Sequence, residues 1–170
     1  HEGVVSAKVA QAVAEAVKRG VHVIPASGRS YRGVVDVARF IGADYAIAQH
    51  GALVRRVADH ATVHSELIPI PQALRIAAAI KEMGLEPFIA VDGYPDAAEY
   101  LFLEEPRQAG TRELISISDF KWEIVGRDKP IPHPGATQVG ALAAEEPVAR
   151  ARDCLAETFG AAYTYMALKS

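Results

Sequence analysis

A repeated helix-then-strand pattern near the start of the chain most limits how it can fold. Residues 6–20 predict a helix with a serine N-cap and a glycine at its end. Residues 21–26 form a short apolar run of the length typical of a buried parallel strand. The same two patterns then recur, as a helix over 34–42 and a strand over 45–48. Helices and strands that alternate with short loops predict an α/β fold with a parallel sheet.

The pattern changes after residue 52. Further strands are predicted at 53–57, 61–68, 88–91, 100–103, 120–125, 136–142 and 161–168, and further helices at 71–84 and 147–160. We therefore expect two regions: a parallel α/β core over residues 1–52 and an α+β unit over 53–170. Two parallel strands do not complete a core, because such sheets are normally buried on both faces. Further core strands are expected from sequence outside the 170 residues.

Composition excludes several classes of protein. Half of the residues are hydrophobic and 23% are charged, which is typical of a globular chain and not of a disordered one. The net charge of −3 argues against sequence-independent binding to nucleic acid, which needs clustered positive charge. No apolar run is long enough to predict a membrane span. The single cysteine, Cys154, fits a reducing compartment, so a cytoplasmic location is expected; the oligomeric state stays open.

The segment ASGRS, residues 26–30, is the first candidate site. In open α/β sheets, ligands bind beyond the carboxyl ends of the strands, and this segment follows a predicted strand. The Ser27 hydroxyl, the Gly28 N–H and the N-terminus of the next helix would together bind an anion, and Arg29 would add positive charge. The alternative is an ordinary strand-to-helix turn, in which serine and glycine are common.

Two other loops are candidates for substrate binding. His50 and Gly51 follow the next predicted strand, so they would lie beside the first loop; the alternative is again a simple turn. Asp92 and Tyr94 lie in a loop, residues 92–96, that would close over a substrate if it is more than a turn.

Two histidines, His60 and His64, have a spacing that would suit a metal ion on a helix. The surrounding sequence predicts a hairpin, in which the two side chains share a face but lie far apart. A structural role is therefore expected for both, and no metal ligand is predicted in the chain.

Residues 22–54 resemble the haloacid dehalogenase superfamily of phosphohydrolases, in its Cof-type branch. Members of this branch have an apolar strand, Ser-Gly-Arg, a helix, a strand that ends in Asn-Gly-Ala, and a hairpin that leads into a large inserted cap. The resemblance implies a partial Rossmann-like core, residues 1–52, and an α+β cap of type C2, residues 53–170. It also implies hydrolysis of a small phosphorylated metabolite, such as a sugar phosphate, phosphoglycolate or a phosphoglycerate-type compound.

The resemblance assigns roles to individual residues. Ser27 matches the serine or threonine that hydrogen-bonds the transferred phosphoryl group, and Gly28 and Arg29 follow it as in the family. His50 stands where the family usually has asparagine, which leaves the contact made there open. A neutral or charged imidazole can still donate a hydrogen bond to a phosphate or sugar oxygen.

The other catalytic parts of the family are not found in these residues. The nucleophile and general acid belong to an Asp-x-Asp motif, and no Asp-x-Asp occurs in the sequence. This motif is expected before His1, and the later lysine and the acidic Mg²⁺ ligands are expected after Ser170. The complete protein is thus expected to be a magnesium-dependent phosphatase that forms an aspartyl-phosphate, with these 170 residues inactive alone. The alternative is a non-catalytic module that binds phosphorylated metabolites and lacks the nucleophile.

Overall fold

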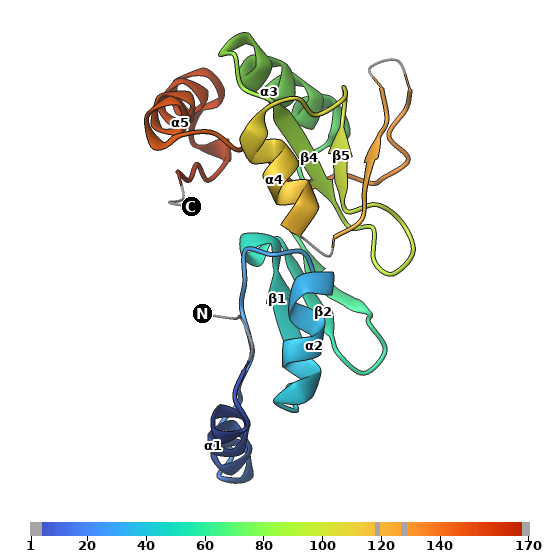
Figure 1. Ribbon diagram of the computed structural model, residues 1–170. Coiled ribbons are helices and arrows are strands. Elements are labelled where there is room, and N and C mark those ends of the chain that lie inside the picture. The colour runs from blue at the N-terminus through green and yellow to red at the C-terminus, as the bar shows by residue number, and fades with distance from the viewer. Residues whose placement is uncertain (1–4, 118–119, 127–128, 168–170) are drawn as a thin grey trace. The chain divides into compact units, whose positions relative to one another are not determined.

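The chain forms two compact units, His1–Glu66 and Leu67–Ser170. The computed structural model describes residues 5–117, 120–126 and 129–167 (Figure 1). The sequence predicts a boundary between residues 52 and 53, whereas the two compact units meet between Glu66 and Leu67. The hairpin after residue 52 belongs to the first unit by its contacts, because its first strand pairs with the strand before it. The interpretation of the two regions as core and cap stays a prediction.

The first unit combines helices with a three-stranded antiparallel sheet of order β1-β2-β3. In chain order its elements are α1 (Ala7–Lys18), α2 (Arg32–Phe40), β1 (Tyr45–Ala48), the short 3-10 turn η1 (Gln49–Gly51), β2 (Leu53–Arg56) and β3 (Thr62–Ser65). The predicted N-cap of α1 is confirmed, since the Ser6 hydroxyl accepts a hydrogen bond of 3.3 Å from the Val9 N–H. Helix α2 lies beside β1 (Figure 1) and buries Val34, Val35 and Ala38.

The strand predicted over residues 21–26 is almost absent. Only Ala26 forms a bridge, which is parallel to Ile47 of β1. Two hydrogen bonds flank it, from the Ile47 N–H to the Pro25 oxygen at 2.9 Å and from the Ser27 N–H to the Ile47 oxygen at 3.0 Å. Within the described part of the chain, this segment has a strand neighbour on one side only, so it lacks the second ladder that a buried parallel strand needs. The predicted parallel direction is confirmed, but the predicted length is wrong.

The second unit contains a four-stranded mixed sheet of order β6-β5-β4-β7. Its β5–β6 pair is parallel, and its β4–β5 and β4–β7 pairs are antiparallel. Its elements are α3 (Ile70–Glu82), β4 (Pro87–Val91), β5 (Tyr100–Phe102), α4 (Ala109–Ile117), β6 (Trp122–Ile124), β7 (Ala136–Ala141), α5 (Glu145–Phe159) and η2 (Gly160–Ala162). One face of the sheet packs on Ala73 and Ala77 of α3, and the other packs on Ile115 of α4. The mixture of helices and strands confirms the predicted α/β class.

Two elements of the second unit differ from the expectation. Helix α4 has no counterpart among the predicted elements; Gly110 and Thr111 near its start are weak helix formers, and Ile115 packs against the sheet. Residues 161–167 form no strand; η2 leads into extended chain that pairs with no described strand, and Leu168 lies outside the described residues. A strand forms only where a neighbour completes its backbone hydrogen bonds.

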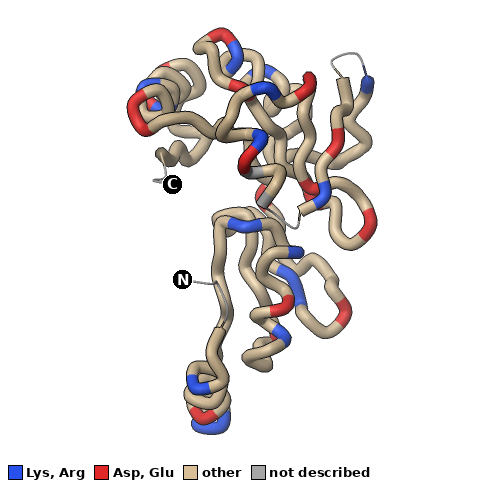
Figure 2. The backbone as a smooth tube through the Cα atoms, viewed as in Figure 1, with Lys and Arg blue, Asp and Glu red and all other residues tan. Residues whose placement is uncertain are grey.

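The structure shows where the charges lie in each unit and how apolar the described helices are. Figure 2 shows residues of both charge signs, Lys and Arg as well as Asp and Glu, in each unit. Among the described helices, none is long and apolar enough to cross a membrane.

Candidate functional site

The Ser-Gly-Arg loop is joined to the end of β1 by its backbone. The backbone N–H of Ser27 donates to the Ile47 carbonyl oxygen. The carbonyl oxygen of Ser27 accepts a hydrogen bond of 3.1 Å from the His50 N–H. The Gln49 N–H donates to the Arg29 oxygen at 2.8 Å. These bonds run in both directions between residues 27–29 and 47–50. The two loops that the sequence places at neighbouring strand ends therefore lie side by side.

The polar groups of this loop are available for an anion. The half-buried Ser27 hydroxyl accepts from the Arg29 N–H at 3.1 Å, which fixes the side chain while leaving its hydrogen to donate. The Gly28 N–H makes no hydrogen bond with the described part of the chain. An unpaired N–H beside a serine hydroxyl is the arrangement that binds phosphate oxygens in turns.

The imidazole of His50 lies directly on Gly28. A Cβ atom at residue 28 would stand 2.2 Å from Cε1 of the His50 ring and 2.5 Å from its Nε2. Real Cβ atoms do not approach other atoms so closely, so this position of the ring requires glycine at residue 28. The ring and the Gly28 backbone thus form one continuous polar surface at the strand end.

An unusual turn holds His50 there. Gln49, His50 and Gly51 all have positive φ angles, of 51°, 55° and 100°. For the two non-glycine residues this conformation is unfavourable, and such strain persists where surrounding bonds enforce it, often at functional sites. Gln49 is also almost completely buried, and its Oε1 has no hydrogen-bond partner among the described residues. Sequence reasoning missed Gln49; the only local signal was the glycine two residues later.

Arg29 and α2 contribute less directly than expected. Arg29 is exposed, and its aliphatic stem lies against Gly33 in the first turn of α2, where an added Cβ would be 3.1 Å from the Cβ of Arg29. The N-cap position of α2, Tyr31, makes no side-chain capping hydrogen bond. The aliphatic part of Arg29 therefore lies at the start of α2.

Asp92 and Tyr94 belong to the second unit, in the loop between β4 and β5. This loop is closed on itself: the Ala97 N–H donates to the Gly93 oxygen at 2.8 Å, and Lys121 Nζ donates to the oxygens of Pro95 and Asp96. Both predicted residues are half-buried and have interactions of their own. Their role in substrate binding stays a prediction.

The described residues do not build a metal site. Nowhere in residues 5–117, 120–126 and 129–167 do three His, Cys, Asp or Glu side chains gather closely enough to hold a metal ion. His64 instead lies 3.4 Å from Glu66, and His60 contacts Tyr31 and Arg39. No set of these described residues fits Mg²⁺.

The contact between Gly28 and His50 leads to a prediction that can be tested by stability alone. Gly28→Ala is expected to push the imidazole of His50 away from residue 28 and to destabilise the first unit by less than about 1 kcal/mol, because this exposed ring can rotate. In a His50→Ala background this cost should disappear, giving a coupling energy of a few tenths of a kcal/mol, at most about 1 kcal/mol, between the two positions. Urea denaturation of the four proteins measures this cycle. Equal costs in both backgrounds would show that the ring does not occupy the space over Gly28.

The chain is similar to known hydrolases in sequence pattern and in fold. The family model for haloacid dehalogenase-like hydrolases matches residues 1–123. No curated protein sequence matches the chain significantly. Among solved structures, a haloacid dehalogenase-like hydrolase from Bacteroides thetaiotaomicron superposes with a TM-score of 0.70 at 10% identity, covering 92% of this chain and 58% of its own.

Two further structures show the same fold. A haloacid dehalogenase-like hydrolase from B. subtilis has a TM-score of 0.65 and 14% identity, with coverage of 93% of this chain and 61% of its own. A protein studied among the phosphatases of the haloalkanoate superfamily, from Bacteroides thetaiotaomicron, has a TM-score of 0.53 and 16% identity, covering 69% and 41%. The chain thus spans about 60% of the length of the first two relatives. Because the family model covers well over half of its residues, the chain belongs to the haloacid dehalogenase-like hydrolases.

Proposed function

We propose that this chain is the phosphate-recognition part of a phosphohydrolase that acts on a small phosphorylated metabolite. One observation carries the proposal: the Ser27 hydroxyl lies at a strand end beside the imidazole of His50 and the Gly28 N–H, which no described residue accepts from. Family membership supports hydrolase chemistry, and one similar protein stands among the phosphatases. Sugar phosphates and phosphoglycolate- or phosphoglycerate-type compounds are the proposed substrates.

In this proposal the residues of the first unit bind and orient the phosphoryl group. Ser27 and the Gly28 N–H donate to its non-bridging oxygens, where negative charge must be stabilised during transfer. His50 donates from its ring to a further phosphate or leaving-group oxygen. The ring lies over Gly28, so its nitrogen would be close to a phosphate held by the Gly28 N–H.

The remaining chemistry is assigned to sequence outside the 170 residues. Magnesium, when bound, neutralises phosphoryl charge, but the described residues do not provide its ligands. The carboxylate that would form the aspartyl-phosphate is likewise expected elsewhere, since the chain has no Asp-x-Asp. The 170 residues alone are therefore proposed to be inactive. The exposed Cys154 is the basis for proposing a cytoplasmic location.

The test is a phosphatase screen of the full-length protein that contains these 170 residues. Inorganic phosphate release from a panel of sugar phosphates, phosphoglycolate and phosphoglycerates is measured with Mg²⁺ and with EDTA. Magnesium-dependent release from at least one of these compounds is expected. Binding of the same compounds without release under either condition would overturn the proposal and favour the non-catalytic binding module.

A further inference from the structure

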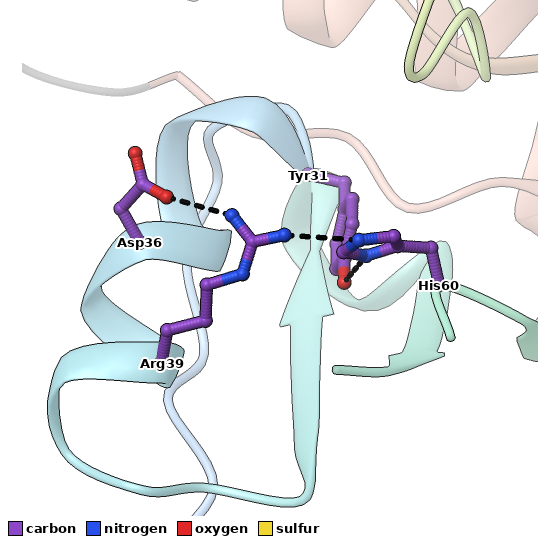
Figure 3. A network of polar contacts seen from close by, with 4 residues as sticks. All are labelled: Tyr31, Asp36, Arg39 and His60. Atoms are coloured by element: carbon purple, nitrogen blue, oxygen red, sulfur yellow. Dashed lines mark hydrogen bonds and ion pairs between the residues drawn. The ribbon is translucent and has the colours of Figure 1, made fainter. Parts of the chain in front are cut away.

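A buried tyrosine at the start of α2 is held by a histidine from the β2–β3 turn (Figure 3). Tyr31 is 1% exposed, and its hydroxyl lies 2.8 Å from Nδ1 of His60. The other ring nitrogen of His60, Nε2, lies 2.9 Å from a guanidinium nitrogen of Arg39 in α2. Arg39 is in turn paired with Asp36 at 3.1 Å. Both nitrogens of one imidazole are therefore engaged by groups from the same helix segment.

The partners of His60 determine where its proton lies. A guanidinium group has only donors, so Nε2 must accept the hydrogen bond from Arg39. A neutral imidazole has a single acceptor nitrogen, which places the proton on Nδ1, from where it is donated to the Tyr31 oxygen. Both ring nitrogens of His60 are thus engaged, Nε2 by Arg39 and Nδ1 by the Tyr31 hydroxyl.

Other contacts hold the two rings rigidly. The Tyr31 and His60 rings meet edge to face with centroids 5.7 Å apart, and the Arg55 guanidinium lies 5.0 Å from the centre of the Tyr31 ring. His60 itself has a φ of 61° in a turn that Asp59 closes by accepting from the Ala61 N–H. A hydrogen bond from Arg56 lowers the pKa of Asp59 to about 2, so this carboxylate remains charged at neutral pH.

Tyr31 is the residue at which the Ser-Gly-Arg loop enters α2. The loop is fixed at its beginning by the bonds of Ser27 and Arg29 to the end of β1. At the end of the loop, the backbone carbonyl oxygen of Tyr31 accepts hydrogen bonds from the N–H groups of Val34 and Val35, and these bonds begin the helix. The loop therefore has two supports: the backbone of β1 at one end and the Tyr31 side chain, held by His60, at the other.

We propose that Tyr31 and His60 are positioning residues that keep the Ser27 hydroxyl and the Gly28 N–H in their phosphate-binding geometry. This inference rests on the proposed function, because it assumes that the loop binds phosphate. Neither side chain touches the substrate in this proposal. Each acts by limiting movement of the loop, since a misplaced donor loses much of its effect on a transition state.

The experiment compares Tyr31→Phe, His60→Ala, the double variant and a control, Arg56→Gln, in the full-length protein. Tyr31→Phe keeps the buried ring and loses only the hydroxyl, whereas Arg56→Gln alters the same turn and leaves the Asp59–Ala61 bond in place. With para-nitrophenyl phosphate as substrate, Tyr31→Phe is expected to lower kcat about threefold to tenfold, the size of one hydrogen bond, with little change in KM. The control should change kcat less than about twofold.

Two further results are expected. The double variant should be no slower than His60→Ala, because both substitutions remove the same contact. Amide hydrogen exchange at Arg29 and His50, whose N–H groups donate to the Ser27 hydroxyl and the Ser27 carbonyl oxygen, should become faster in Tyr31→Phe and stay unchanged in Arg56→Gln.

The outcomes separate the two proposals. If the wild-type protein hydrolyses the ester but Tyr31→Phe keeps both kcat and the exchange rates, the positioning role is wrong and the proposed function stands. If the wild-type protein hydrolyses no phosphate ester while exchange at Arg29 and His50 still becomes faster in Tyr31→Phe, the support of the loop by Tyr31 is confirmed and the phosphatase function is wrong. Additive losses in the double variant would also overturn the shared contact.

Discussion

Replacing Ser27 with alanine in the full-length protein is expected to lower phosphatase turnover by about 10²–10³-fold, the effect of removing one donor to a developing oxyanion. The loss should appear mainly in kcat, because the hydroxyl contributes most where phosphoryl charge is greatest. The structure gives the side chain a fixed place, since its oxygen already accepts from the Arg29 N–H at 3.1 Å. Initial rates with the best substrate of the phosphatase screen measure this change.

Two companion variants show whether the hydroxyl itself is responsible. Ser27→Thr keeps the hydroxyl and the turn bond to Arg29, so it should recover much of the lost rate. Ser65→Ala removes an exposed hydroxyl from β3 and should leave the rate unchanged. Wild-type turnover in Ser27→Ala, with Ser27→Thr no faster, would remove Ser27 from the catalytic site.

Gly93→Ala is expected to destabilise the second unit by about 3 kcal/mol, the upper part of the range for overpacked sites. An added Cβ would lie 1.9 Å from the Ala98 oxygen and 2.5 Å from the Ala98 carbonyl carbon. These are backbone atoms in a closed loop, so no side-chain rotation can relieve the contact. For a unit of this size the unfolding midpoint should fall by on the order of 10–20 °C, which calorimetry or circular dichroism measures.

Gly110→Ala is the matched control in the same unit. Its Cβ would make only ordinary contacts, the nearest at 3.5 Å from the Leu142 oxygen, and alanine favours the helix α4 in which residue 110 lies. The control should therefore be as stable as the wild type or slightly more stable. If Gly93→Ala unfolds at the same temperature as Gly110→Ala, the close approach of the chain at Ala98 is contradicted.

The Gly93 prediction also bears on the predicted substrate residues of this loop. Asp92 and Tyr94 flank Gly93, and their loop is tied by Lys121 to the backbone of Pro95 and Asp96. A loop closed in this way can present side chains in a fixed geometry. The sequence indicated a turn here from its Asp, Gly and Pro residues, but the close packing of Gly93 on Ala98 depends on residues that meet only in the folded chain.

Local sequence patterns predicted the elements whose ends are formed by residues close in the sequence. Ser6 caps α1, and glycines follow α1, α2 and α3 at positive φ angles, as the sequence indicates. Elements that depend on distant partners were predicted less well. Residues 21–26 fall short of a full strand, residues 161–167 form none, and α4 appears without a strong sequence signal, because backbone pairing and burial are decided by neighbours in space.

The sequence by itself determined the family, the α/β class and the neighbouring strand-end loops that contain Ser27 and His50. These depend on short-range order along the chain: an apolar run, a small polar turn and a helix recur at readable spacings. Only the tertiary structure decided that the His50 ring rests on Gly28, that Gln49 is buried in a left-handed turn, and that His60 holds Tyr31. The two residues of that last pair are 29 positions apart, and the bond forms only because the β2–β3 turn lies against α2. A periodic sequence pattern predicts which side chains are buried. It does not predict which atoms far apart in the sequence come within hydrogen-bonding distance.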